Sequence, residues 1–208
     1  AQAILAQGLV LLFGHHGSHA SFWTRTHAAL MEGLLTVIVQ TSPVPSHPST
    51  ALLEALFRSF EYLEDLRGCR ILVVCDGCEV AGAEEGENPK RGRVTQDAAD
   101  RYAEHLERLR KLVSTASFGW PCVELLELTR RHGSALALAV AVRQVDTPFI
   151  MVAQHDNFFV QPVPLPQLLQ AMETNPWAKC VGFQSMATVD YVQKVHLRYG
   201  LKIEPRHV

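Results

Sequence analysis

The sequence lacks several features that mark well-known functional classes. No apolar run reaches the roughly 18 residues that a membrane-spanning helix needs. Neither Gly-x-x-x-x-Gly-Lys-Ser/Thr nor Gly-x-Gly-x-x-Gly occurs, so nothing predicts a P-loop or a dinucleotide-binding turn. The net charge is −2 and the pI about 6.6, without the basic excess that is typical of proteins that bind nucleic acids. We therefore expect no nucleic-acid partner and no membrane span in this chain.

Charged residues are also scarce, and the cysteines lack a disulfide pattern. Charged residues make up 19% of the chain and hydrophobic residues 48%, so the 208 residues can bury the core of one ordinary domain. The five cysteines are an odd number without the spacing of a disulfide framework. We expect mostly reduced, buried thiols, and hence a cytoplasmic location or the cytosolic face of a membrane.

Strand and helix patterns alternate through most of the chain. Short apolar runs predict buried strands at 35–40 and 70–75 and further strands at 122–128, 149–154 and 178–184. Helical spacing predicts helices between them, at 49–68, 95–113, 133–145 and 164–176. The helix at 133–145 is apolar almost all round, which predicts that it is buried. This order predicts a three-layer α/β fold of the Rossmann-like type, with a mostly parallel sheet and flanking helices.

The two ends of the chain fit this pattern less well. The pattern of residues 1–33 indicates either a helix and a loop or a segment outside the domain. We expect the domain itself to span residues 34–208. The chain begins with Ala and ends in KIEPRHV, so we expect a processed protein or a fragment that is truncated at its C-terminus.

Polar residues follow three of the predicted strands. Thr41-Ser42-Pro43 ends the first strand, Cys75-Asp76-Gly77-Cys78 ends the second, and Gln154-His155-Asp156-Asn157 ends the fourth. In open α/β sheets, ligands bind beyond the carboxyl ends of the strands. We therefore expect these three segments to meet at one edge of the sheet and to form a ligand site.

The order of these motifs resembles the nucleotide-binding half of a GT-A glycosyltransferase, and within that group it is similar to family 2. The resemblance covers roughly residues 34–184 and is carried by VIVQTSPVP, VVCDGC, HGSALALAVAV and TPFIMVAQHDNFF. It implies a GT-A-like fold and the transfer of a sugar from a nucleotide diphosphate sugar, with a UDP-sugar as the expected donor, to a hydroxyl acceptor.

The resemblance also assigns nucleotide-binding residues. It implies that Asp76 and Gly77 hold the nucleotide, because a carboxylate at the end of a strand can accept the imide N–H of uracil or a ribose hydroxyl. It places the turn at Thr41 and Ser42 beside the base. The residues alone leave another interpretation open, in which Asp76 is a turn residue before Gly77.

The fourth strand enters the position of the family's Asp-x-Asp motif. The resemblance implies that Asp156, Gln154 and His155 hold Mn²⁺ or Mg²⁺, hard cations that prefer oxygen ligands and that stabilise a departing diphosphate. Gln154 stands where the motif has its first acid, and an amide oxygen carries no charge. His155 is also consistent with a packed, hydrogen-bonded histidine.

No catalytic residue can be assigned from the sequence. An inverting transferase needs a base that deprotonates the acceptor hydroxyl, yet the acids after Gln184 are Asp190 and Glu204, neither in a matching motif. Cys75 replaces the first Asp of the family's Asp-Asp-Gly pattern, and Leu138 and Ala139 stand where members of the family often have Arg-Asn. These departures favour a second hypothesis, a non-catalytic α/β binding domain that keeps the fold without turnover.

Overall fold

The fold is built on one mixed, mainly parallel sheet. The computed structural model describes residues 10–14, 31–63, 65–82, 93–175 and 177–183. The sheet has six strands in the order β6-β3-β2-β7-β1-β8. Their bounds are β1 Val10–Gly14, β2 Leu35–Thr41, β3 Arg70–Cys75, β6 Val123–Glu127, β7 Phe149–Gln154 and β8 Cys180–Phe183. Strands β6, β3, β2 and β7 are parallel to one another, which confirms the predicted α/β class.

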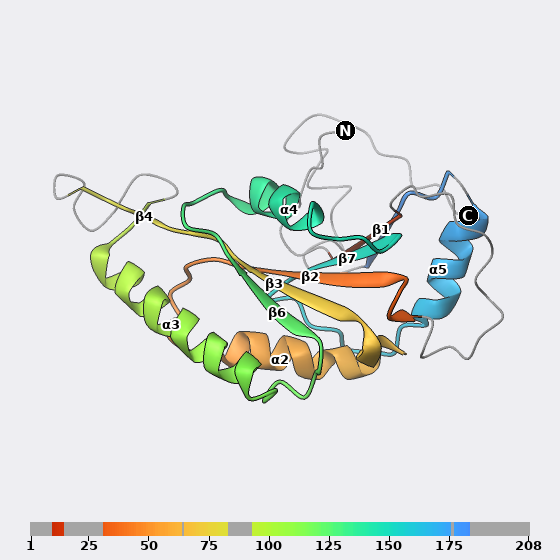
Figure 1. Ribbon diagram of the computed structural model, residues 1–208, viewed down its shortest axis with the longest axis horizontal. Coiled ribbons are helices and arrows are strands. Elements are labelled where there is room, and N and C mark those ends of the chain that lie inside the picture. The colour runs from red at the N-terminus through yellow and green to blue at the C-terminus, as the bar shows by residue number, and fades with distance from the viewer. Residues whose placement is uncertain (1–9, 15–30, 64, 83–92, 176, 184–208) are drawn as a thin grey trace, which may run out of the picture.

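Helices cover both faces of the sheet. Figure 1 shows α4 on one side of the strands and α2 and α3 on the other, which makes three layers. The helices are α2 Ala51–Ser59, α3 Gln96–Ser114, α4 Ser134–Val142 and α5 Leu165–Thr174. Every residue of β2 is buried, because a central parallel strand is covered on both faces.

Two apolar clusters hold the layers together. The larger packs one face of the sheet against α2, α3 and α5, and includes Phe57, Phe60 and Leu109. The smaller packs the other face against α4, through residues such as Ile38 and Ala141. Alternate residues of β2 point into the two clusters, as the pleat of a strand requires. Burying a side chain as large as Phe57 stabilises the fold by about 1.5–3 kcal/mol.

The first strand of the sheet differs from the prediction for the N-terminal segment. Val10–Gly14 was expected in a helix or outside the domain, but it forms β1 between β7 and β8 and is antiparallel to both. The run AILAQGLVLLFG has the length and apolar content of either a strand or a helix. Periodicity alone does not separate these two interpretations. The rest of the segment expected at 1–33 lies almost entirely outside the described residues.

Some element boundaries also differ. Helix α2 ends at Ser59, and two short 3₁₀ turns, Phe60–Tyr62 and Leu66–Gly68, take the place of the rest of the predicted helix. The predicted loop between β3 and α3 contains two short parallel strands, β4 Glu79–Val80 and β5 Arg93–Val94. Helix α4 is only partly buried, because it lies on the outside of the sheet and leaves Leu136 63% exposed.

The state of the cysteines and the length of the helices were also predicted from the sequence. All five cysteines are free thiols, as predicted, but only Cys69 and Cys75 are buried, whereas Cys78 is partly exposed and Cys122 and Cys180 are exposed. Burial raises the pKa of Cys75 to about 12, so this thiol of the Cys75-x-x-Cys78 pair is not a thiolate near neutral pH. Among the described residues, no helix is both long and apolar enough to cross a membrane.

Candidate functional site

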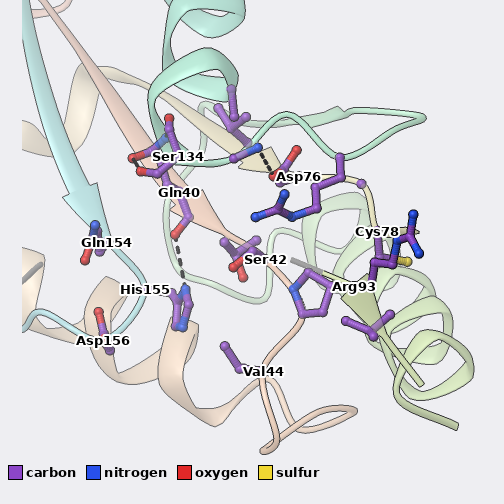
Figure 2. A pocket seen from close by; sticks show the side chains of 18 residues that line it. Gln40, Ser42, Val44, Asp76, Cys78, Arg93, Ser134, Gln154, His155 and Asp156 are labelled. Carbon is purple, nitrogen blue, oxygen red and sulfur yellow. Dashed lines mark hydrogen bonds between the residues drawn. The ribbon is translucent and has the colours of Figure 1, made fainter. Parts of the chain in front are cut away.

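A cavity of about 740 Å³ opens at the carboxyl ends of β2, β3 and β7. Strand β2 lies between β3 and β7, so the chain leaves it toward β3 on one side and later returns to β7 on the other. Such a switch point is where open α/β sheets bind ligands. The volume lies in the range of small-molecule sites. Figure 2 shows Gln154, His155 and Asp156 on one flank of this cavity, and Asp76, Cys78 and Arg93 on the other.

All seven residues predicted from the sequence line this one cavity. They are Thr41, Ser42, Asp76, Gly77, Gln154, His155 and Asp156. The convergence of the three strand ends is therefore confirmed. The roles assigned to these residues stay predictions. The Oγ1 atom of Thr41 is buried and has no hydrogen-bond partner among the described residues.

The Asp76 side chain holds the loop that precedes α4. Its two carboxylate oxygens accept hydrogen bonds from the backbone N–H groups of His132 and Gly133, each at 2.8 Å. The Asp76 backbone oxygen accepts a further bond from the Tyr102 hydroxyl at 2.7 Å. Asp76 is only 6% exposed. A carboxylate has about four lone-pair sites, so these bonds leave room for a ligand donor while fixing the carboxylate in one orientation.

Gly77 allows the same loop to approach closely. A Cβ atom at Gly77 would lie 2.4 Å from the backbone carbon of Arg130, much closer than real Cβ contacts. The Asp-Gly pair is therefore required by packing as well as by turn formation. Together, Asp76 and Gly77 fix the backbone at residues 130–133 against the end of β3.

The predicted metal ligands form an incomplete donor set. Strand β7 ends at Gln154, so Asp156 lies in the following turn and is exposed. The Gln154 Oε1 already accepts a bond from Asn157 Nδ2 at 3.4 Å. His155 Nδ1 lies 3.2 Å from the Gln40 backbone oxygen, to which it donates, so only its Nε2 has a lone pair to offer. Among the described residues, no group of three His, Cys, Asp or Glu side chains could hold a metal ion.

This donor set does not fit a tightly held divalent cation. Hard divalent cations are held mainly by charged oxygen ligands, and the expected Asp-x-Asp motif would supply two carboxylates. The flank supplies one exposed carboxylate at Asp156, one neutral amide at Gln154 and one imidazole nitrogen at His155. The cause is local: the first acid of the expected motif is replaced by Gln154, and the strand ends too early to place Asp156 on the same face.

Two further residues, Gln40 and Ser134, line the cavity and were not predicted from the sequence. Gln40 Nε2 donates to the Ser134 backbone oxygen at 2.7 Å, and Ser134 Oγ donates to Gln40 Oε1 at 3.0 Å. This pair connects the end of β2 to the first turn of α4. Gln40 also lies opposite Gln154 in the β2–β7 register. The signal for Gln40 was its polar side chain near the end of the mostly apolar strand β2. Nothing in the sequence marked Ser134.

Two arginines also line the cavity. Arg93 lies at the start of β5 and pairs with Glu79 at 3.2 Å. Arg131 lies in the loop that Asp76 holds and is exposed. No ion pair to a described carboxylate is formed by Arg131. The cavity therefore carries one arginine whose charge is available to a ligand and one whose charge is shared with Glu79.

Histidines support the wall formed by Ser42, Pro43 and Val44. The rings of His47 and His105 stack with centroids 3.8 Å apart, and both side chains are buried. The Val44 backbone N–H donates to His47 Nδ1 at 3.4 Å. Burial lowers the pKa of His47 to about 3, with smaller contributions from neighbouring positive charge. The wall therefore depends on a neutral His47.

The comparisons with known proteins do not assign this chain to a family. No protein-family model and no curated protein matches it.

Proposed function

We propose that this chain is a glycosyltransferase domain that binds a nucleotide diphosphate sugar in the cavity between β2, β3 and β7 and transfers the sugar to a hydroxyl acceptor. The observation that carries the proposal is the convergence of all seven predicted residues on one cavity at the switch point of the sheet. The volume of about 740 Å³ is large enough for a ligand with a base, a ribose and a sugar.

The lining of the cavity suits a hydroxyl-rich ligand. Amide, hydroxyl and carboxylate groups from Gln40, Ser42, Asp76 and Gln154 face it, and they offer both donors and acceptors. In this proposal, Asp76 accepts from the imide of uracil or from the ribose, and Thr41 and Ser42 lie beside the base. The donor is then a UDP-sugar.

In the transfer reaction, an acceptor hydroxyl attacks the anomeric carbon and the nucleoside diphosphate departs. Two things must be supplied: a base for the hydroxyl proton and positive charge for the departing diphosphate. Asp156 is the exposed carboxylate of the cavity. The base remains unassigned, and the proposed chemistry is limited to donor binding and sugar transfer. The divalent cation expected from the resemblance stays a prediction that the donor set at Gln154 and Asp156 fits poorly.

A second candidate function is binding without turnover. The neutral Gln154 at the position of an expected acid favours it, because an amide cannot supply the charge that a departing diphosphate requires. The two candidates share the donor site and differ in whether bound donor is consumed. A single set of samples can therefore test both.

The test is thermal stability against UDP-, GDP- and dTDP-sugars, with and without Mn²⁺, followed by assay of released nucleoside diphosphate with simple sugar acceptors. A ligand at about 100 times its Kd stabilises the folded state by about 2.7 kcal/mol, which is a clear shift in Tm. We expect a shift with UDP-sugars. Release of UDP with an acceptor supports the transferase, and binding without release supports the non-catalytic domain.

A variant that blocks the cavity tests whether the ligand-induced shift in Tm comes from binding there. Ser134 lines the cavity from the exposed first turn of α4, so Ser134→Trp fills it at little cost to the core. Ala135 is exposed on the same turn but does not line the cavity, so Ala135→Trp is the matched control. We expect Ser134→Trp to abolish the ligand-induced shift and Ala135→Trp to keep it. Absence of any shift in the folded parent protein contradicts the proposed function.

A further inference from the structure

We propose that this site binds the diphosphate of its ligand without a divalent cation, with Arg131 supplying the positive charge that a metal would otherwise provide. The inference rests on the proposed function, because it concerns the charged part of the same ligand. It departs from the metal site that the resemblance implies. Three observations carry it: the donor set at the end of β7, the charge of Arg131, and the way in which the loop of Arg131 is held.

The end of β7 is better suited to hydrogen bonding than to metal binding. Gln154 is neutral and bonded to Asn157, and His155 is bonded through Nδ1 to the backbone of β2. Asp156 is one exposed carboxylate, whose charge is screened by water. The remaining acid of the cavity, Asp76, already accepts two backbone N–H groups on the opposite flank. The end of β7 therefore lacks the pair of well-placed acids that would hold a cation against a diphosphate.

Arg131 provides charge of the right kind. A guanidinium presents several N–H donors in a planar fork, which matches phosphate oxygens in a bidentate manner and stays protonated at all working pH values. Arg131 lines the cavity and forms no ion pair with a carboxylate among the described residues. Arg93 also lines the cavity but shares its charge with Glu79. Of the two arginines that line the cavity, Arg131 is therefore the one expected to interact more strongly with a bound diphosphate.

The backbone beneath Arg131 is fixed before any ligand arrives. The two residues that follow it, His132 and Gly133, donate their N–H groups to Asp76 at 2.8 Å. The residue that precedes it, Arg130, lies directly against Gly77. Binding then has to order only the Arg131 side chain, and not the loop. Such preorganisation lowers the entropic cost of binding. Asp76 is in this respect a positioning residue for Arg131.

The test is calorimetric titration with three probes, UDP, uridine and inorganic pyrophosphate, each in EDTA and in Mn²⁺. We expect UDP and pyrophosphate to bind in EDTA, with Mn²⁺ changing either Kd less than about threefold. A hydrogen bond to a charged group is worth about 1.5–3 kcal/mol, so Arg131→Ala is expected to weaken UDP and pyrophosphate about 10- to 100-fold and to leave uridine unchanged. Arg131→Lys restores part of this loss, because it returns the charge without the fork.

The matched controls are Arg130→Ala and Asp156→Asn. Arg130 is exposed, precedes Arg131 and does not line the cavity, so its removal changes the net charge equally without touching the ligand. We expect it to leave every Kd unchanged. With Asp156→Asn, we expect Mn²⁺ still to change either Kd less than about threefold, whereas a metal site at this residue would lose an Mn²⁺-dependent gain.

The outcomes separate this inference from the proposed function. UDP binding that requires Mn²⁺ overturns the inference and leaves the glycosyltransferase proposal standing. Equal effects of Arg131→Ala and Arg130→Ala also overturn it. Pyrophosphate binding that depends on Arg131, without binding of any nucleotide, supports the phosphate site and contradicts the proposed function. Absence of binding by every probe to the folded protein overturns both.

Discussion

The stacked histidines under the cavity wall make a testable link between pH and stability. His47 accepts a hydrogen bond from the Val44 N–H, so it must keep an unprotonated Nδ1 in the folded state. His105 Nδ1 lies 3.1 Å from the Ser49 backbone oxygen, to which it donates, and its buried Nε2 has no partner among the described residues. A proton added to either ring would place charge in a buried site next to a second imidazole 3.8 Å away.

The direction and size of the effect follow from the pKa of His47. Burial, followed by the charges of His105, His155 and Arg101, lowers this pKa from 6.5 to about 3. The unfolded chain therefore binds a proton that the folded chain rejects. Stability is fully present above pH 6.5 and is lost as the pH falls toward the folded pKa. His47 alone is expected to destabilise the fold by about 2 kcal/mol between about pH 7 and about pH 5. Burial also lowers the pKa of His105, and this adds to the loss.

The assay is urea unfolding at a series of pH values, followed by the fluorescence of the buried Trp120. His47→Asn removes the titrating group, and its side-chain oxygen can accept the Val44 N–H. We expect the parent protein to lose about 2 kcal/mol more than His47→Asn between about pH 7 and about pH 5, with equal m-values. Identical pH dependence in the two proteins would refute the reasoning. A measured pKa near 6.5 for His47 in the folded protein would do the same.

Two further predictions concern the loop behind the cavity and the helix that follows it. Gly77→Ala is expected to destabilise the fold by about 1–3 kcal/mol, because the new Cβ would lie 2.4 Å from the backbone of Arg130; an unchanged urea midpoint would contradict this contact. Thr95 caps α3 through a bond from the Ala98 N–H at 3.2 Å, so Thr95→Ala should cost about 1 kcal/mol. Thr50→Ala is the control, because the Thr50 side chain at the start of α2 makes no cap bond; an equal loss of stability in both variants would count against the capping argument.

Much of the fold could be predicted from local pattern. Strands β2, β3 and β7 are short apolar runs between turn signals, and their identity depends on burial on both faces, which the sequence encodes directly. Strand β1 could not be predicted in this way, because its position between β7 and β8 depends on pairing with residues more than 130 positions away. The partial exposure of α4 was also hidden, since an apolar helix has no polar stripe to show which face meets the sheet.

The candidate site was predictable where it follows strand ends. The position after a buried strand places Ser42, Asp76 and Gln154 at one edge, because parallel strands share their carboxyl ends. What each side chain does there could not be predicted. Whether Asp76 faces a ligand or holds the loop before α4 depends on the approach of His132 and Gly133, 56 and 57 residues further along the chain.

The sequence by itself therefore determined the alternation of strands and helices, the three-layer class and the edge at which a ligand can bind. It did so because burial and turn formation depend on residues close together in the chain. Only the tertiary structure decided that β1 joins the sheet, that Gln40 meets Ser134, and that Arg131 lines the cavity on a loop fixed by Asp76. These features depend on contacts between distant segments, whose energies arise only when the layers have packed together.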